Sequence, residues 1–345
     1  MKNAMSALNL KISVIIAAYH GEKYIDEQLE SLFRQTRIPD EILIGDDSSD
    51  DKTFQAMEAV RSHYTGELKY IKNTPKSGIC ANFEKLYKTA TGDIVFFCDQ
   101  DDVWLPEKIE KMTEEMLKHP QCDLLFCDSY CTDSQLTHSG ETMFSLYGIT
   151  PQDIQLINNA KAFPLVVMRD IPFSGHDIAL RKPLSYNIFP FTSNLGAYHD
   201  QHLGYLASYM ERMRCLPEPL TLYRRHESNV SVLYSTATAK KKYDPRNGCI
   251  HSGKIMEFVL KMKRMREILY SSPASLSEIP ENKKYLDEMI AFFEKRNRLL
   301  YSGVFLRPFH ITIKDYMNYF RYCKGLRTLA HDLICKKIEL KDTQS

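Results

Sequence analysis

Hydrophobic residues in the first third of the chain alternate between short continuous runs and sets with helical spacing. The runs predict strands over Ile12–Ala18, Glu41–Gly45, Leu68–Ile71, Ile94–Cys98 and Leu124–Cys127. Between the runs, apolar residues recur every three or four positions, which predicts amphipathic helices. Strands that alternate with helices of about 10–15 residues are typical of a mostly parallel sheet covered on both faces. We therefore expect an α/β fold.

The pattern changes twice along the chain. From about residue 128 to 235 the alternation is less regular, and from 236 helical spacing dominates. We therefore predict one α/β domain over residues 1–235 and a helical extension over residues 236–345. Within the domain, residues 1–127 form the regular half and residues 128–235 form the less regular half.

Composition excludes several classes of protein. The 345 residues are 43% hydrophobic and 26% charged, and a net charge of +1 gives no general attraction to nucleic acid. The nine cysteines are odd in number and form no CxxC pair, which favours reduced thiols in the cytoplasm. The run Ile12–Ala18 leads directly into a predicted helix, so we interpret it as a strand and not as a signal peptide. The chain contains no run of about 18 apolar residues, so we predict no membrane span.

Acidic residues follow two of the predicted strands. Asp99, Asp101 and Asp102 come directly after one of them, and Asp46 and Asp47 close another. Carboxylates without a basic neighbour repel one another unless a cation lies between them, and Mg²⁺ or Mn²⁺ with phosphate oxygens is a usual solution. Solvated acidic turns that cap the following helices are the alternative. Because both acidic ends fall on the same edge of a parallel sheet, we favour a nucleotide-phosphate and metal site.

Four blocks of sequence occur in order at compatible spacings: Ser13–Tyr19, Leu32–Thr36, Asp46–Thr53 and Cys98–Trp104. Together they resemble family 2 glycosyltransferases, most closely the rhamnosyltransferase-like branch of bacterial polysaccharide enzymes. The resemblance covers roughly residues 11–230. It implies the GT-A fold, a nucleotide-sugar donor, a divalent metal (Mn²⁺ or Mg²⁺) and inversion at the anomeric carbon. Residues 1–127 would then be the nucleotide-binding half and residues 128–235 the acceptor half.

The resemblance also implies roles for single residues on the donor side. Ala17 and Tyr19 would contact the nucleobase, and Asp47 would accept the N3–H of uracil or thymine, so the donor would be a UDP- or dTDP-sugar. Asp101 would contact the metal directly, with Asp99 near the ribose or the metal-bound waters.

Later segments complete the expected site. Asn82 lies on the predicted helix after the Asn73–Gly78 turn, and the resemblance implies that it contacts the donor. In the block Leu222–Asn229, Arg224 would pair with diphosphate oxygens and His226 would contact the metal or a phosphate. His226 has the alternative of being an ordinary loop residue.

On the acceptor side, the resemblance points to Asp200 as the general base, whereas an N-cap is the alternative interpretation of that residue. His176-Asp177 departs from the family pattern, where relatives usually carry small or apolar residues, so a direct catalytic role there is doubtful.

The extension is basic. Residues 237–270 hold nine Lys or Arg against three Asp or Glu. Helices that pack together with solvated basic faces explain this pattern. The functional alternative is reversible docking on an anionic membrane surface, the inner face of the cytoplasmic membrane, which would suit a glycan or lipid-linked acceptor in surface polysaccharide synthesis.

Two other functions compete with glycosyl transfer. A sugar nucleotidyltransferase needs a Gly-rich, basic phosphate loop after the first strand, and Ala17–Glu22 lacks one. A non-catalytic nucleotide-sugar-binding protein would tolerate loss of Asp101 or Asp200, and both are present.

Overall fold

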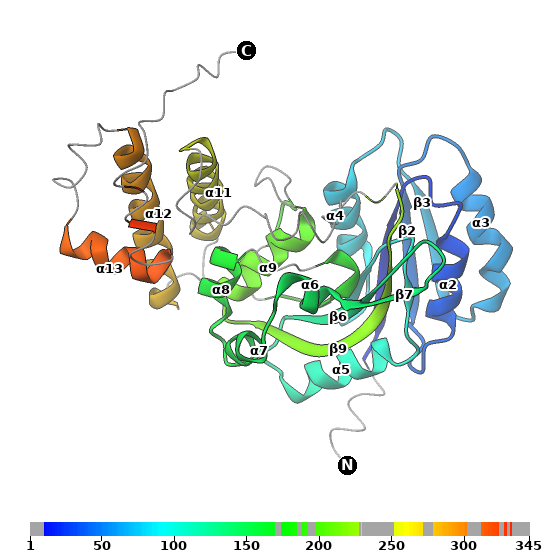
Figure 1. The fold of residues 1–345 in the computed structure, drawn as a ribbon. Helices are drawn as coiled ribbons and strands as arrows, with labels where there is room; N and C mark the ends of the chain where they lie inside the picture. Colours follow the sequence, from blue (N-terminus) through cyan, green and yellow to red (C-terminus); the bar gives the residue numbers. More distant parts are fainter. Residues whose placement is uncertain are drawn as a thin grey trace. The chain divides into compact units, whose positions relative to one another are not determined.

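A nine-stranded sheet forms the centre of the first part of the chain in the computed structural model (Figure 1). The structure describes residues 10–169, 174–184, 188–191, 198–227, 229, 252–271, 279–301, 312–323, 328–329 and 332. Within these residues the strand order is β3-β2-β1-β4-β8-β6-β9-β5, and β7 pairs with β6. The strands are β1 (Ile12–Ala18), β2 (Glu41–Asp46), β3 (Glu67–Lys72), β4 (Ile94–Cys98), β5 (Val103–Trp104), β6 (Leu124–Thr132), β7 (His138–Thr142), β8 (Ile178–Arg181) and β9 (Met213–Arg224).

The sheet is mixed, with a parallel half and an irregular half. β3, β2, β1 and β4 are parallel, as the alternating pattern predicts. β8 inserts antiparallel between β4 and β6, and β9 runs parallel to β6 but antiparallel to β5. The predicted α/β architecture is confirmed. The antiparallel β8 places the residues that precede it at the end of β4.

Helices cover both faces of the parallel half. On one face, Val14 and Ile16 of β1 share a buried cluster with Leu29 of α2 and Ile109 of α5. On the other face, Phe83 of α4 packs on Phe97 of β4 with ring centroids 5.4 Å apart. The helices and 3-10 turns of this part are α2 (Ile25–Phe33), α3 (Lys52–Val60), η1 (Arg61–His63), α4 (Ile79–Thr89), α5 (Lys108–Lys118), α6 (Met143–Tyr147), α7 (Pro151–Asn158), α8 (Ala162–Arg169), η2 (Gly175–Asp177) and α9 (His199–Tyr209).

The chain divides into two compact units. The first comprises Met1–Val166 with Ile171–Lys240, and the second comprises Val167–Asp170 with Lys241–Ser345. The boundary predicted at residues 235 and 236 lies outside the described residues. The basic residues that follow it, Lys240, Lys241, Lys242 and Arg246, lie outside them too.

The second unit is helical, as predicted. Its helices are α11 (Ser252–Ser271), α12 (Pro280–Tyr301) and α13 (Ile313–Tyr322). Arg296 of α12 is buried and binds Asp332 through Nε at 2.6 Å, and Tyr319 of α13 donates to the same carboxylate at 2.8 Å. This buried pair ties α12 and α13 to the segment that contains Asp332.

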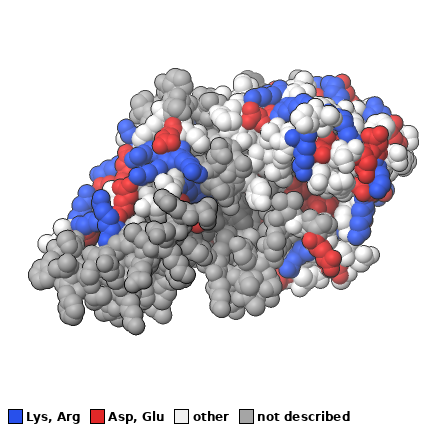
Figure 2. Space-filling model, turned by 90° about the horizontal axis from the view of Figure 1, so that it is seen from above, with Lys and Arg blue, Asp and Glu red and all other residues white. Residues whose placement is uncertain are grey.

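Many basic side chains of the second unit are paired with acids. Lys263 lies 2.5 Å from Glu294, and Arg321 lies 2.8 Å from Glu288. Figure 2 shows Lys and Arg side chains beside Asp and Glu side chains on the described surface. Membrane docking through these helices stays a prediction. Among the described residues, no helix combines the length and the apolar character needed to cross a bilayer.

Candidate functional site

Three adjacent strands bring the expected donor residues to one edge of the sheet. β2, β1 and β4 are parallel neighbours, so their carboxyl ends carry Asp47, then Ala17 and Tyr19, then Asp99. Gln100 joins two of these ends, because its amide donates to Tyr19 O at 3.0 Å and accepts from Tyr19 N at 2.9 Å. The convergence expected from the two acidic strand ends is therefore present.

The loop after β3 holds Asp47 in place. Oδ1 accepts hydrogen bonds from Asn73 Nδ2 (3.0 Å), Ser77 N (3.1 Å) and Ser77 Oγ (2.8 Å), and Oδ2 accepts one from Gly78 N (2.7 Å). Burial alone would raise the pKa of Asp47, but the bonds from Ser77, Asn73 and Gly78 lower it below its ordinary value. Asp47 is therefore a fixed anion at the end of β2, and its backbone N–H donates to Ala18 O at 2.9 Å, one residue before the half-exposed Tyr19.

Asn82 lies behind this loop and is 1% exposed. Its Nδ2 donates to Gly45 O at 2.7 Å, and its Oδ1 accepts from Asn73 Nδ2 at 3.1 Å. Gly45 allows this contact, because a Cβ there would lie 2.0 Å from Asn82 Oδ1. In the structure Asn82 supports the Asp47 loop, and its predicted contact with the donor stays a prediction.

Two of the three carboxylates after β4 gather around a histidine. Nδ1 of His176 lies 3.4 Å from Asp99 Oδ2 and 3.3 Å from Asp102 Oδ2. One possible ligand atom from each of these residues lies within 4.8 Å of the other two, so the cluster has the spacing of a metal site. Asp102 and His176 are fully buried and Asp99 is partly exposed, which leaves one open side.

The donor set fits a divalent cation. Among the described residues, Oδ2 of Asp102 is buried and accepts no hydrogen bond. Burial, together with the nearby Asp101 and Asp99 charges, raises the pKa of Asp102 to about 8 despite the opposing effect of His176. A buried carboxylate oxygen beside a second carboxylate and an imidazole offers ligands that suit Mn²⁺, and a bound ion would displace the proton of that imidazole.

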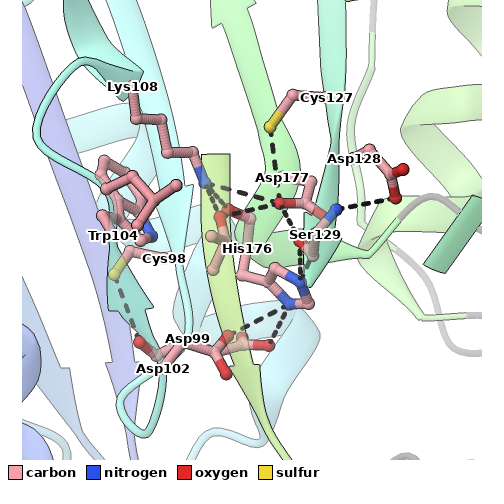
Figure 3. A network of polar contacts seen from close by, with 12 residues as sticks. Cys98, Asp99, Asp102, Trp104, Lys108, Cys127, Asp128, Ser129, His176 and Asp177 are labelled. Carbon is pink, nitrogen blue, oxygen red and sulfur yellow. Dashed lines mark hydrogen bonds and ion pairs between the residues drawn. The ribbon is translucent and has the colours of Figure 1, made fainter. Parts of the chain in front are cut away.

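A buried charged network lies behind His176 (Figure 3). Nε2 of His176 lies 3.1 Å from Asp177 Oδ2, and Ser129 Oγ donates to both oxygens of Asp177 at 2.7 and 2.6 Å. Lys108 Nζ donates to His176 O at 2.5 Å and to Thr221 Oγ1 at 2.6 Å, and it lies 3.5 Å from Asp177 Oδ1. Burial lowers the pKa of His176, but the Asp177 and Asp102 charges outweigh it and raise that pKa well above its ordinary value. The network fixes the direction in which His176 faces the carboxylates.

The third carboxylate has a different partner. Asp101 Oδ2 lies 2.8 Å from His226 Nε2, so two of the three residues predicted to contact the metal lie together. They do not belong to the cluster of Asp99, Asp102 and His176. Their metal contact stays a prediction.

Arg224 joins the loop after β4, which carries Asp101 and Asp102, to α2. Its Nε donates to Asp101 O at 2.8 Å, its Nη1 to Ser134 O at 2.9 Å and its Nη2 to Glu27 Oε2 at 2.5 Å. Its backbone N–H donates to Asp102 Oδ1 at 2.9 Å. The guanidinium therefore fixes the loop that carries the acids, and its contact with a diphosphate stays a prediction.

Asp200 lies in the first turn of α9. The N-cap of this helix is Tyr198, and Asp200 Oδ1 accepts a hydrogen bond from the next residue, Gln201 N, at 2.6 Å. The alternative interpretation as an N-cap is therefore wrong. Burial raises the pKa of Asp200 to about 7, with the Asp99 charge acting in the same direction and the Gln201 bond against it. A carboxylate with this pKa suits a general base near neutral pH.

Sequence reasoning missed Asp102 and His176 as members of the cluster. The family resemblance implies roles for Asp99 and Asp101 but none for Asp102, and His176 departs from the family pattern. The departure itself was the available signal, because a histidine and an acid at a position that is usually apolar require buried partners.

Comparisons with known proteins agree with this geometry. The model of the family "Glycosyl transferase family 2" matches residues 13–182, which include the Asp47 loop, the three carboxylates after β4 and His176.

Three curated relatives are similar over different lengths. An uncharacterized glycosyltransferase from Nostoc is 26% identical over 69% of this chain and 72% of its own length. An Escherichia coli UDP-Glc:alpha-D-GlcNAc-diphosphoundecaprenol beta-1,3-glucosyltransferase is 31% identical over 31% of this chain and 42% of its own length. A Shigella flexneri dTDP-rhamnosyl transferase is 34% identical over 28% of this chain and 34% of its own length.

A solved structure supports the fold. Staphylococcus aureus TarS, residues 1–349 in complex with UDP, has a TM-score of 0.51 at 18% identity and covers 94% of this chain and 88% of that one. This likeness confirms the expected GT-A-like fold with additional C-terminal helices.

Proposed function

We propose that this chain is an inverting, metal-dependent member of glycosyltransferase family 2, an enzyme family that uses nucleotide sugars and whose model matches residues 13–182. It transfers a sugar from a UDP- or dTDP-sugar to a glycan or lipid-linked acceptor. The observation that carries the proposal is the position of α9: a Cβ on Gly175 would lie 2.8 Å from His199 Nε2 and 3.9 Å from Asp99 Oδ1, so the first turn of this helix lies beside the carboxylates after β4. Asp200, whose pKa burial raises to about 7, is the second residue of that turn.

Single displacement accounts for this arrangement. The acceptor hydroxyl attacks the anomeric carbon from the face opposite the leaving nucleotide, and a base takes its proton as the new bond forms. Asp200 takes this proton at its carboxylate. Its position in the first turn of α9 holds it on a rigid element.

Asp47 supports a pyrimidine donor. Its Oδ2 accepts one hydrogen bond, from Gly78 N, among the described residues, so it retains capacity to accept N3–H of uracil or thymine. The ring of Tyr19, which is 48% exposed, offers a surface for the base. Two of the relatives are named for UDP-Glc and dTDP-rhamnosyl transfer, which agrees with this class of donor.

Asp99, Asp102 and His176 would hold the divalent ion, with Asp101 as the alternative ligand. When bound, the ion supplies positive charge that neutralises the diphosphate leaving group. The protein contributes the orientation of the ligands, because Arg224 N fixes Asp102 Oδ1 and the Asp177 network fixes His176.

The acceptor that we propose is a glycan or a lipid-linked sugar. The name of the Escherichia coli relative specifies a diphosphoundecaprenol acceptor, which supports a lipid-linked acceptor in surface polysaccharide synthesis. Such an acceptor would bring the enzyme to the inner face of the cytoplasmic membrane.

A donor-hydrolysis screen tests the proposal. The protein is incubated with UDP-, dTDP- and GDP-sugars in Mn²⁺ or Mg²⁺, and release of nucleoside diphosphate is measured. We expect release from UDP- or dTDP-sugars that EDTA abolishes. A parallel reaction with sugar 1-phosphate and nucleoside triphosphate detects pyrophosphate. Pyrophosphate release without diphosphate release would instead identify a nucleotidyltransferase.

A further inference from the structure

His199, the first residue of α9, is a buried histidine with aromatic neighbours. The residue is 2% exposed, and its ring lies 4.1 Å from the ring of Phe83 and 5.6 Å from that of Phe97. Among the described residues, neither Nδ1 nor Nε2 has a hydrogen-bond partner. Unpaired buried nitrogens cost stability, and a phenylalanine would fill the same aromatic surroundings without that cost.

The edge of the ring faces the donor side of the site. A Cβ built on Gly175 would lie 2.8 Å from His199 Nε2 and 3.9 Å from Asp99 Oδ1, so both groups flank one point at the start of η2. Any larger residue at position 175 would displace the imidazole. The glycine thus keeps Nε2 close to the carboxylate expected to face the donor.

His199 also precedes the expected base directly in the chain. The anomeric carbon must lie between the diphosphate, held near Asp99, and the hydroxyl activated by Asp200. A group beside Asp99 and next to Asp200 therefore borders the space of the transferred sugar. Burial lowers the pKa of His199 to about 4, so its ring is neutral and offers one N–H donor and one acceptor nitrogen.

We propose that His199 is a specificity-determining residue that hydrogen-bonds a hydroxyl group of the transferred sugar through its imidazole edge. The proposal rests on the proposed glycosyltransferase function, and it adds that His199 recognises the sugar part of the donor. A hydroxyl both donates and accepts, so it matches a neutral imidazole. A site built to pair with a hydroxyl rejects a sugar without it, because the imidazole then stays unpaired.

His202 provides the internal control. It lies on the same helix and is 1% exposed, but its Nε2 lies at hydrogen-bond distance, 2.9 Å, from Ile188 O. That bond gives His202 a structural role. The same substitution at the two positions is therefore expected to have opposite effects.

The experiment compares His199→Phe with His202→Phe in the full-length protein. The donor is the one that wild type hydrolyses fastest among UDP-glucose, UDP-galactose, UDP-N-acetylglucosamine and dTDP-rhamnose. For His199→Phe we expect a higher Tm, an affinity for the bare nucleoside diphosphate within twofold of wild type, and kcat/KM for the intact donor at least tenfold lower. For His202→Phe we expect a lower Tm and donor kinetics within twofold of wild type.

A second pair keeps the test decisive if the aromatic variant does not fold. Glutamine and methionine have similar lengths, so His199→Gln retains a polar tip near the position of Nε2 and His199→Met does not. We expect the Gln variant to keep more donor efficiency than the Met variant. Equal kcat/KM for Gln and Met, or wild-type kcat/KM in His199→Phe, would overturn the inference. If wild type binds none of the four donors in calorimetry, the proposed function has failed and the inference with it.

Discussion

Nδ1 of His176 lies 3.3 Å from Oδ2 of Asp102, and both side chains are fully buried although 74 residues separate them in the chain. The contact exists because β8 runs antiparallel beside β4, which brings the start of β8 to the end of β4. Together with Asp99 it forms the group that could hold a metal ion.

Asp102→Asn is expected to weaken metal binding. The substitution keeps the size of the side chain and the bond from Arg224 N, but it replaces an anionic oxygen in the cluster. We expect the Mn²⁺ concentration needed for half-maximal donor hydrolysis to rise by about 10–100-fold or more. Mn²⁺ titrations of activity and of the Mn²⁺ electron paramagnetic resonance signal measure the change.

Two further variants complete that test. Glu218→Gln removes an exposed acid that pairs with Lys111 and should leave the Mn²⁺ dependence unchanged. Asp101→Asn tests the assignment that the family resemblance implies. If Asp101→Asn weakens Mn²⁺ binding and Asp102→Asn does not, Asp101 is the direct ligand and the prediction for Asp102 is wrong.

Asp47→Asn is expected to weaken binding of pyrimidine nucleotides. The carboxylate is the proposed acceptor for N3–H, and hydrogen bonds to charged groups contribute about 1.5–3 kcal/mol, so UDP affinity should fall roughly 10–100-fold. Calorimetry with UDP, dTDP and GDP measures it. Asp50→Asn, at an exposed position three residues along, serves as the control. Tighter binding of GDP than of UDP and dTDP by wild type would contradict the pyrimidine assignment.

Lys108→Met is expected to destabilise the first unit. Lys108 is 1% exposed, and its Nζ lies 3.5 Å from the buried Asp177 carboxylate, so methionine would leave part of a buried charge uncompensated. Breaking a buried pair from one side costs about 3–5 kcal/mol. Urea unfolding followed by fluorescence measures the free energy of unfolding. Lys111→Met, which breaks the exposed pair with Glu218, should leave the free energy of unfolding nearly unchanged, and an equal loss in both variants would refute the argument.

The parts of the fold that local pattern determines could be predicted from the sequence. β1 and β4 have the predicted bounds because each is a mostly apolar run that is buried in the parallel half of the sheet. The insertion of β8 between β4 and β6 was not predictable in the same way, because strand order depends on pairing between distant segments. The convergence of Asp47 and Asp99 followed from the parallel half. The role of His176 did not, because its partner Asp102 reaches it only through that insertion.

Turnover is expected to rise with pH through neutrality. The pKa of Asp200 is raised to about 7, and its active form is the carboxylate. Below that pKa the protonated fraction grows, so kcat should fall about tenfold per pH unit, and above it kcat should level off. Measurements of kcat at saturating donor, acceptor and Mn²⁺ between pH 5 and 9 test this shape. A rate that is flat from pH 5 to 9 would remove Asp200 from the role of base.

Asp200→Asn is the sharpest test of the mechanism. Asparagine keeps the size of the side chain and an oxygen for the Gln201 N–H, but it cannot accept a proton from the acceptor hydroxyl. Because the base acts mainly in the transition state, we expect kcat to fall about 10²–10⁴-fold while donor affinity stays nearly constant. Rapid-quench kinetics and calorimetry with the intact donor separate the two quantities. Proton NMR of the wild-type product gives the anomeric configuration, which we expect to be opposite to that of the donor. A variant that transfers sugar at close to the wild-type rate, or a wild-type product that retains the donor configuration, would show that Asp200 is not the base of an inverting displacement.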